Sequence, residues 1–234
     1  MTNSEKFLKA YNEIDKFLIK DGNFDSYKSY TYKLKNSSNK SVRRFKDELT
    51  AMGELRNAIV HNPKIGEKAI AEPHDNITER IQYIRDSLIK PETVNKFFFE
   101  VVGADEDETA TDVLKKMKEY SFSQFPVFNG EKITEVINSN TVARWCASNI
   151  DDDGTLLVEN LKIKDLLDHV EFKYNFKMVD RTTTIDEVYF LFIDHVKKNN
   201  CNLDVVFISH NGKNGEKLLG CVTIDDIAPF FISE

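Results

Sequence analysis

The chain has 234 residues, of which 41% are apolar and 30% are charged. This apolar content is enough to build a hydrophobic core and excludes wholesale disorder, while only nine Gly and five Pro exclude collagen-like and low-complexity classes. No apolar run approaches the roughly 20 residues of a membrane span, and the first residues do not form a signal segment. We therefore expect a cytoplasmic protein with no membrane partner.

The cysteine and histidine patterns indicate neither disulfides nor a metal. The three cysteines, Cys146, Cys201 and Cys221, are odd in number and contain no CxxC pair, which fits a reducing compartment. The five histidines are scattered, and none lies at metal-ligand spacing from a cysteine or from another histidine. We expect no metal site and no required cofactor.

The net charge of −7 is unevenly distributed along the chain. Residues 1–90 hold 17 Lys and Arg against 13 Asp and Glu, whereas residues 91–234 hold 15 against 26. Such an asymmetry suggests two units with different partners. The basic half tolerates a nucleic acid as a partner, and the acidic half does not over its whole surface.

Apolar spacing predicts four helices in the first 90 residues. They are expected over residues 4–20 and 25–36, from Ser41 to the Asn62-Pro63 pair, and over 74–89. The third helix ends there because a proline disfavours the α region for the residue before it. Residues 1–90 are therefore predicted to form a four-helix bundle.

The second half repeats one unit, helix–strand–turn–strand–helix, with corresponding points about 80 residues apart. Copy one, about residues 91–150, has helices over 111–120 and 141–148 that enclose strands over 125–128 and 133–137. Copy two, about residues 158–234, has helices over 184–198 and 225–231 that enclose strands over 204–208 and 218–222. The whole chain is therefore predicted to be α+β, and the interface between two repeats is a natural small-molecule site.

Short segments in both copies resemble a known family. Copy one carries SQFPVF at 123–128 and ITEVI at 133–137, and copy two carries VVFI at 205–208 and LGCVTIDDI at 219–227. These segments resemble a tandem pair of cystathionine-β-synthase-like (CBS) domains, also called a Bateman module. The last segment is similar to the Gly–apolar–apolar–Thr–x–x–Asp signature of that family, with Gly220, Thr223 and Asp226 in place.

The resemblance implies a regulatory adenosine ligand between the copies, such as AMP, ADP, ATP, S-adenosylmethionine or a cyclic dinucleotide. It implies that Thr223 and Asp226 hold the ribose, and Cys221 and Asp225 from the same segment complete the candidate ligand-binding set. A carboxylate can accept two ribose hydroxyl protons, and the N–H groups of the following helix favour a phosphate. The alternative is that Thr223 and Asp226 only form a capping box.

Copy one departs from the signature at the corresponding place. Asn138 stands where the family has Thr, and Thr141 stands where it has Asp. No carboxylate of this segment remains to hold a ribose. We therefore expect one adenosine site in copy two and a degenerate or empty site in copy one.

The predicted third helix ends with an Arg–polar–x–x–x–His pattern, formed by Arg56, Asn57 and His61. The pattern resembles the HEPN domains (higher eukaryote and prokaryote nucleotide-binding), which are small helical bundles. Many of them are metal-independent endoribonucleases whose site is completed across a homodimer. The resemblance implies that these three residues are catalytic and that RNA is the substrate.

The chemistry allows this reading and also a simpler one. His61 is a residue type that suits acid–base work, while the planar fork of Arg56 suits a phosphate. Positions i and i+5 lie about 140° apart on a helix, so the two residues do not share a narrow face. Nearby cations track an RNA backbone in this interpretation: Lys40, Arg43, Arg44 and Lys46. In the simpler interpretation His61 caps the helix, Arg56 pairs with a carboxylate such as Glu54, and the cations are a solvated face.

Two functions therefore remain open from the sequence. In the first, an adenosine-nucleotide-sensing CBS pair controls a HEPN-like ribonuclease domain. In the second, the chain is a non-enzymatic nucleotide sensor whose helical domain mediates dimerisation or partner binding. Both predict a homodimer and a coupling between the two halves.

Overall fold

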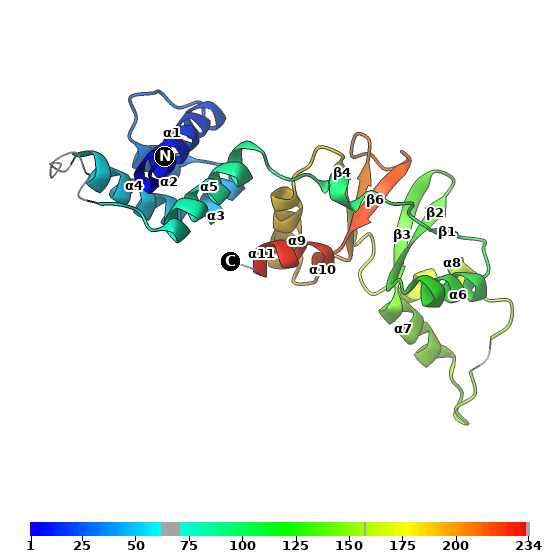
Figure 1. Ribbon diagram of the computed structural model, residues 1–234. Coiled ribbons are helices and arrows are strands. Elements are labelled where there is room, and N and C mark those ends of the chain that lie inside the picture. The colour runs from blue at the N-terminus through cyan, green and yellow to red at the C-terminus, as the bar shows by residue number, and fades with distance from the viewer. Residues whose placement is uncertain (62–70, 157, 233–234) are drawn as a thin grey trace. The chain divides into compact units, whose positions relative to one another are not determined.

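The structure, a computed structural model, describes residues 1–61, 71–156 and 158–232. The chain divides into two compact units, Met1–Glu92 and Thr93–Glu234 (Figure 1). The first unit contains only helices among its described residues, and the second contains two small sheets with flanking helices. The predicted α+β class is confirmed.

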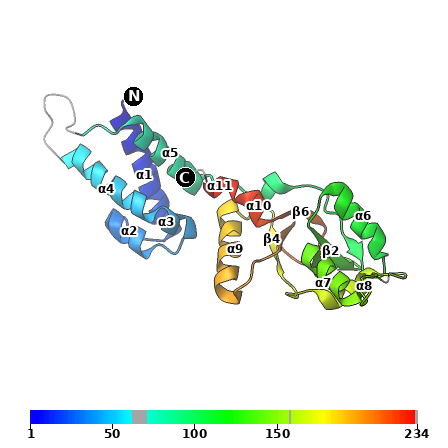
Figure 2. The same cartoon turned by 90° about the horizontal axis from the view of Figure 1, so that it is seen from below.

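The first unit has five helices within its described residues. They are α1 (Asn3–Asp21), α2 (Tyr30–Asn36), α3 (Lys40–Arg44), α4 (Lys46–His61) and α5 (Asp75–Ile89). α1 begins at a capping box in which the side chains of Thr2 and Glu5 bond each other's backbone N–H groups. Leu49 of α4, Ile81 of α5 and Phe7 of α1 are fully buried in one shared core. In Figure 2, α1, α4 and α5 run side by side, with α2 and α3 at one end of them.

The predicted third helix is in fact two helices, α3 and α4. Phe45 lies between them with φ −90° and ψ 10°, outside the regular helix. Its side chain is buried in the core, so the apolar spacing continues across the break and conceals it from the sequence. The predicted second helix is also shorter than expected, because the Ser29 hydroxyl accepts from the N–H of Tyr32 and starts α2 at Tyr30. The predicted end at Asn62-Pro63 lies outside the described residues.

Copy one of the second unit contains a three-stranded sheet. The 3-10 turn η1 (Val94–Phe97) comes first in this unit and packs in the core of copy two. The elements of copy one are β1 (Ala104–Asp105), α6 (Ala110–Tyr120), β2 (Gln124–Asn129), β3 (Lys132–Asn138) and α7 (Ser139–Asn149). β1 pairs with β2 in parallel, and β2 pairs with β3 in antiparallel. The short strand β1 was not predicted, since two residues give no periodic signal.

Copy two repeats this topology. The chain first forms α8 (Ile163–Leu166) and the 3-10 turn η2 (Leu167–His169), which pack in the core of copy one. The elements of copy two follow: β4 (Phe176–Asp180), α9 (Ile185–Asn199), β5 (Val205–Ser209), β6 (Leu218–Val222), α10 (Ile224–Ile227) and α11 (Pro229–Ile232). β4 pairs with β5 in parallel, β5 pairs with β6 in antiparallel, and both sheets carry a bulge in the same antiparallel pair. The strand β4 was missed because Val179 is its only buried residue, which leaves no alternating pattern.

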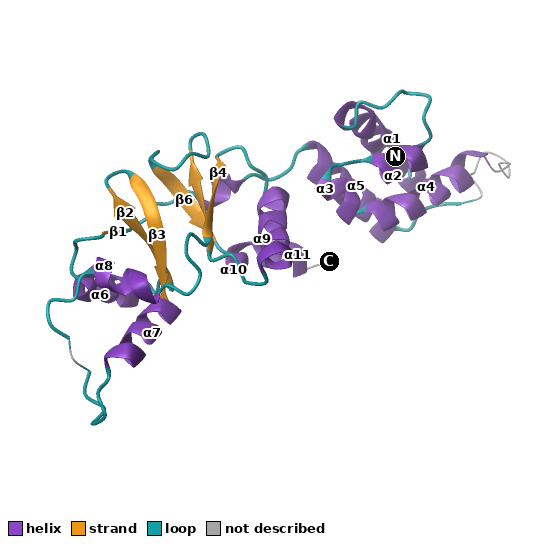
Figure 3. Cartoon of the chain, turned by 180° about the vertical axis from the view of Figure 1, so that it is seen from behind, coloured by secondary structure: helices purple, strands orange, loops and turns teal. Residues whose placement is uncertain are grey.

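The last helix, predicted as one over residues 225–231, is in fact two short helices, α10 and α11. α10 is a single turn and α11 starts anew at Pro229, since proline has no N–H to continue a helix. Each copy has its own core between its sheet and the helices that cover it, which are α6, α7 and α8 in copy one and α9 and α10, together with η1, in copy two. A third cluster joins the two sheets of the unit through Ile133 and Val136 of β3 and Val205 and Phe207 of β5. Figure 3 shows the two sheets next to each other, with the helices of each copy on its outer side.

Candidate functional site

The copy-two junction is the place where β6 passes into α10, and it holds Cys221, Thr223, Asp225 and Asp226. Thr223 is the N-cap of α10, with extended backbone angles. Both Asp225 and Asp226 lie in the first turn of α10 and are exposed. The four residues named by the sequence therefore gather at one strand–helix corner.

Asp226 is anchored by Thr223. One oxygen of its carboxylate, Oδ2, accepts from the backbone N–H of Thr223 at 2.7 Å and from the Thr223 hydroxyl at 2.8 Å. A carboxylate offers about four acceptor positions, and these two bonds use half of them. The capping interaction anticipated by the sequence is thus present, and it still leaves Oδ1 with no bond to another described residue.

Cys221 lies on β6, two residues before Thr223. Burial, together with the nearby Asp226 charge, raises the pKa of Cys221 to about 12. Its thiol therefore stays neutral near pH 7 and offers an apolar contact instead of a nucleophile. It also packs against the cluster that joins the two sheets.

The expected phosphate site at the N-terminus of the following helix is not present in the form that the sequence suggested. α10 has only four residues, and the N–H of its N-cap Thr223 is already bonded to Asp226. Two exposed carboxylates occupy this turn. The copy-two junction is therefore suited to the hydroxyl groups of a ligand and not to its phosphates.

The copy-one junction, Asn138 and Thr141, is closed by its own side chains. The Asn138 Oδ1 accepts from the N–H of Thr141 at 3.0 Å and from its hydroxyl at 3.1 Å, and Thr141 is buried. Sequence reasoning found no carboxylate here, yet copy two supplies one. The Nδ2 of Asn138 donates to Oδ2 of Asp204 at 3.4 Å, a contact that sequence reasoning missed because 66 residues separate the two.

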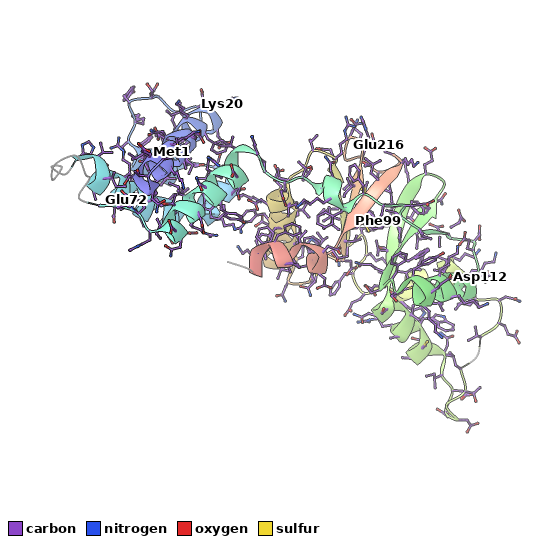
Figure 4. All side chains as sticks on the ribbon, in the orientation of Figure 1. Met1, Lys20, Glu72, Phe99, Asp112 and Glu216 are labelled. Carbon is purple, nitrogen blue, oxygen red and sulfur yellow. The ribbon has the colours of Figure 1, made fainter. Side chains whose placement is uncertain are left out.

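Two hollows lie between the copies, and neither is lined by Thr223 or Asp226. The larger, about 840 Å³, includes Phe99, Phe128, Glu216 and Leu218, and Figure 4 labels Phe99 and Glu216. The smaller, about 520 Å³, is formed around Glu135, Tyr174 and Asn214 among others. Leu218 begins β6 and Thr223 follows its end, so the larger hollow lies toward the opposite end of this strand.

In the helical unit the structure brings Arg56, Asn57 and His61 together. The Nη1 of Arg56 donates to Nε2 of His61 at 2.9 Å and to the side-chain oxygen of Asn57 at 3.2 Å. A guanidinium has no acceptor, so this contact requires that His61 Nε2 carries no proton. The helix-wheel argument that separated positions 56 and 61 was too strict, because the long Arg56 side chain spans the difference.

The Arg56 side chain is held by a ring that the sequence did not point to. Its guanidinium carbon lies 5.8 Å from the ring centre of Tyr11 on α1, and the Tyr11 and Tyr30 ring centres are 4.4 Å apart. Burial and the nearby Asp15 raise the pKa of Tyr11 to about 12, with Arg56 opposing them. The Nε of Arg56 is buried with no hydrogen-bond partner among the described residues.

The described residues contain no group of three or more His, Cys, Asp or Glu side chains able to hold a metal ion. Within the same residues, each helix is too short or too polar to cross a membrane.

Residues 99–148 match the family model of the CBS domain. A comparison with curated proteins gives no match. Among solved structures, the CBS domain pair of protein MJ0100 in complex with 5-methylthioadenosine and S-adenosyl-L-methionine is 17% identical, with a TM-score of 0.43, over 60% of this chain and 96% of that chain. CBSX2 in complex with AMP is 12% identical, with a TM-score of 0.42, over 61% and 97%. A CBS domain-containing protein of unknown function from Kribbella flavida is 14% identical, with a TM-score of 0.44, over 60% and 99%.

Proposed function

We propose that the CBS-domain pair of residues 93–234 binds one adenosine nucleotide per chain at the copy-two junction, and that the bound ligand regulates the helical unit. The observation that carries the proposal is the Thr223–Asp226 pair, at the end of β6, in the second of two copies with one topology. The CBS match over residues 99–148 supports the ligand class.

The ribose is the part of the ligand that this junction suits. Asp226 keeps the two acceptor positions of Oδ1 for the two ribose hydroxyls, while Thr223 fixes the carboxylate in place before the ligand arrives. Cys221 offers an apolar contact, and Asp225 adds a second exposed acceptor. The two carboxylates repel phosphates, so the phosphate end of a nucleotide points away from α10.

The ligand class is tested by thermal denaturation of the full chain with AMP, ADP, ATP, S-adenosylmethionine and cyclic dinucleotides. Binding stabilises the folded state by RT ln(1 + [L]/Kd), about 2.7 kcal/mol at a hundredfold excess over Kd. We expect an upward shift with at least one adenosine ligand and none with the matched guanosine nucleotide. No shift with any adenosine ligand contradicts the proposal.

Regulation requires that ligand binding at the copy-two junction changes the conformational equilibrium of the helical unit. The coupling free energy between two such sites is typically about 1–3 kcal/mol. α5 ends at Ile89 and the second unit starts at Thr93, so few residues connect the two units. A Gly/Ser insertion after Lys90 is expected to weaken the response of the helical unit and to leave nucleotide affinity nearly intact. We also propose that the chain is a homodimer, which sedimentation at micromolar concentration tests.

A second candidate function, endoribonuclease, is favoured by one observation, the 2.9 Å contact between Arg56 and His61. In this reading His61 Nε2 takes the proton of a ribose 2′-hydroxyl as the oxygen attacks the adjacent phosphorus, and Arg56 turns from His61 to the phosphate oxygens. The products are a 2′,3′-cyclic phosphate and a 5′-hydroxyl, whose proton comes from water.

His61→Ala separates the two functions, with His74→Ala as the matched control because His74 is an exposed histidine of the same unit with no side-chain capping bond. A ribonuclease loses RNA cleavage in His61→Ala alone, in buffer with a metal chelator. A non-enzymatic sensor shows no cleavage in any of the three proteins and keeps its nucleotide affinity. Cleavage that survives in His61→Ala rejects the catalytic assignment.

A further inference from the structure

The positive charge of the helical unit is concentrated in one stretch. Residues 26–46 contain seven Lys and Arg and no Asp or Glu. The remainder of residues 1–90 holds ten Lys and Arg against 13 Asp and Glu, so the basic character of this unit comes from that stretch alone. It covers α2, α3 and the segments beside them, and Figure 2 shows α2 and α3 at the same end of the unit.

Lys33 is the one fully buried cation of this stretch, and Arg44 is half-buried with its Nη2 inside the unit. The Lys33 side chain pairs with Asp15 of α1, the two atoms being 2.5 Å apart. Lys35, Lys40 and Arg43 are exposed, and Lys28 and Lys46 are half-buried. Three of the seven cations are therefore exposed at the surface, and three more, including Arg44, are partly accessible.

Two tyrosine rings stand exposed among these cations. Tyr27 is 77% exposed and Tyr32 is 43% exposed, which is unusual for side chains that would gain from burial. The Nζ of Lys28 lies 5.2 Å from the ring centre of Tyr27 and 4.9 Å from that of Tyr32. A cation thus lies over two exposed tyrosine rings.

Two further exposed cations, Lys35 and Arg43, lie beside this group. Lys35 follows Tyr32 by three residues, close to one turn of α2, so the two side chains lie near each other. Arg43 of α3 is tied to the end of α2, because its Nε donates to the carbonyl oxygen of Ser37 at 3.1 Å. We name Tyr27, Lys28, Tyr32, Lys35 and Arg43 the basic tyrosine surface.

We propose that the basic tyrosine surface binds single-stranded nucleic acid. Cations that follow a phosphate backbone combined with aromatic rings on which bases stack are the chemistry of sequence-tolerant single-strand binding. The two exposed rings favour this partner over an anionic membrane surface, for which positive charge alone suffices. The basic tyrosine surface does not include Arg56 or His61, so the proposal does not depend on whether that pair cleaves RNA.

The test is fluorescence anisotropy of the full chain with a labelled 15-nucleotide oligouridylate, measured over a range of salt concentrations. Tyr27→Ala with Tyr32→Ala removes the stacking faces and is expected to weaken binding at least about fivefold, with the salt slope unchanged. Lys28→Gln with Lys35→Gln and Arg43→Gln removes three phosphate contacts and is expected to lower the slope of log K against log salt by about 2. Unfolding curves of each variant check that the fold is kept.

The matched controls are the same kinds of substitution at exposed residues outside the basic tyrosine surface. Lys6→Gln with Lys9→Gln removes exposed cations from α1, and Tyr120→Ala removes an exposed tyrosine from α6. Neither is expected to change binding. Equal losses in the controls, equal binding of a 15-base-pair duplex, or binding only to vesicles that contain phosphatidylserine and not to oligouridylate would each overturn the proposal.

Discussion

Gly220 of β6 and Glu135 of β3 occupy the same position in the two copies, and each receives the chain segment that precedes the first strand of the other copy. At Gly220 the segment pairs through its backbone: Phe98 forms an antiparallel bridge with Gly220, and the N–H of Phe99 donates to the carbonyl of Leu219 at 3.0 Å. At Glu135 a side chain takes this role, since the N–H of Tyr174 donates to both carboxylate oxygens, at 2.9 and 3.0 Å.

The difference explains why only copy two keeps the glycine of the CBS signature. A Cβ on Gly220 would lie 2.0 Å from the carbonyl oxygen of Phe97, so no side chain fits where the backbone approaches. In copy one the Glu135 side chain occupies that space and offers its own acceptors. The carboxylate is buried and also accepts from the N–H of Val136. The two junctions are therefore related by topology and differ in chemistry.

Gly220→Ala is expected to destabilise the fold by about 3 kcal/mol, the upper end of overpacking costs, because the obstructing atoms belong to the backbone. Urea unfolding measures the loss, and hydrogen exchange of the Phe99 amide shows whether the segment pairing opens. Gly130→Ala is the control: Gly130 has φ +62° and no atom within 4 Å of the position that a Cβ would take, so it costs only left-handed strain of about 1–2 kcal/mol. Unchanged Phe99 exchange in Gly220→Ala would contradict this explanation.

Glu135 and Glu216 are expected to change stability with pH in opposite directions. Burial raises the pKa of Glu135, with Asp204 adding to it and the Val136 and Tyr174 N–H groups and Lys173 opposing. The contribution of Glu135 is therefore full below the unfolded value of about 4.3 and is lost as the pH rises through the raised folded value. The stability advantage of the native chain over Glu135→Ala should shrink as the pH rises from about 4 to 7.

Glu216 supplies the opposite case. Hydrogen bonds from Asn211 first, and from Ser209, lower the pKa of Glu216 to about 2. Its contribution is present above about 4.3 and is lost as the pH falls toward 2, so the native advantage over Glu216→Ala shrinks on acidification. Urea midpoints of the three proteins across this range measure both trends. Two parallel trends would show that the Glu135 carboxylate is not buried as described.

The ion pair of Lys33 and Asp15 predicts that one substitution lowers the free energy of unfolding strongly and that a second substitution restores most of it. Asp15→Ala leaves the buried Lys33 ammonium without its partner, and breaking such a pair typically costs about 3–5 kcal/mol. Asp15→Ala with Lys33→Met replaces the charge by an apolar side chain and should recover most of that loss. Thermal unfolding of both variants provides the measurement, and an equal loss in the double variant would contradict a buried ion pair.

The sequence predicted the elements whose apolar residues form a repeated or alternating pattern. It did not predict the features that depend on a single contact. The strands β2, β3, β5 and β6 carry apolar runs bounded by turns and were predicted nearly to their ends. The break at Phe45 was hidden because this side chain is buried like its neighbours in the pattern. Asp204 and Tyr11 approach Asn138 and Arg56 only through the fold, so no local spacing could have named them.

The proposed function depends above all on one adenosine nucleotide per chain, held by Asp226, and isothermal titration of the full chain with the ligand of largest thermal shift measures this binding. The matched control is Glu187→Ala, because Thr184 bonds Glu187 through its N–H and hydroxyl at 2.8 and 2.9 Å, as Thr223 bonds Asp226. We expect one site per chain. The affinity of Asp226→Ala should be tenfold to hundredfold weaker, because a lost charged acceptor costs roughly 1.5–3 kcal/mol, and the affinity of Glu187→Ala should be unchanged. Two equivalent sites per chain, or equal losses in the two variants, would contradict the proposal.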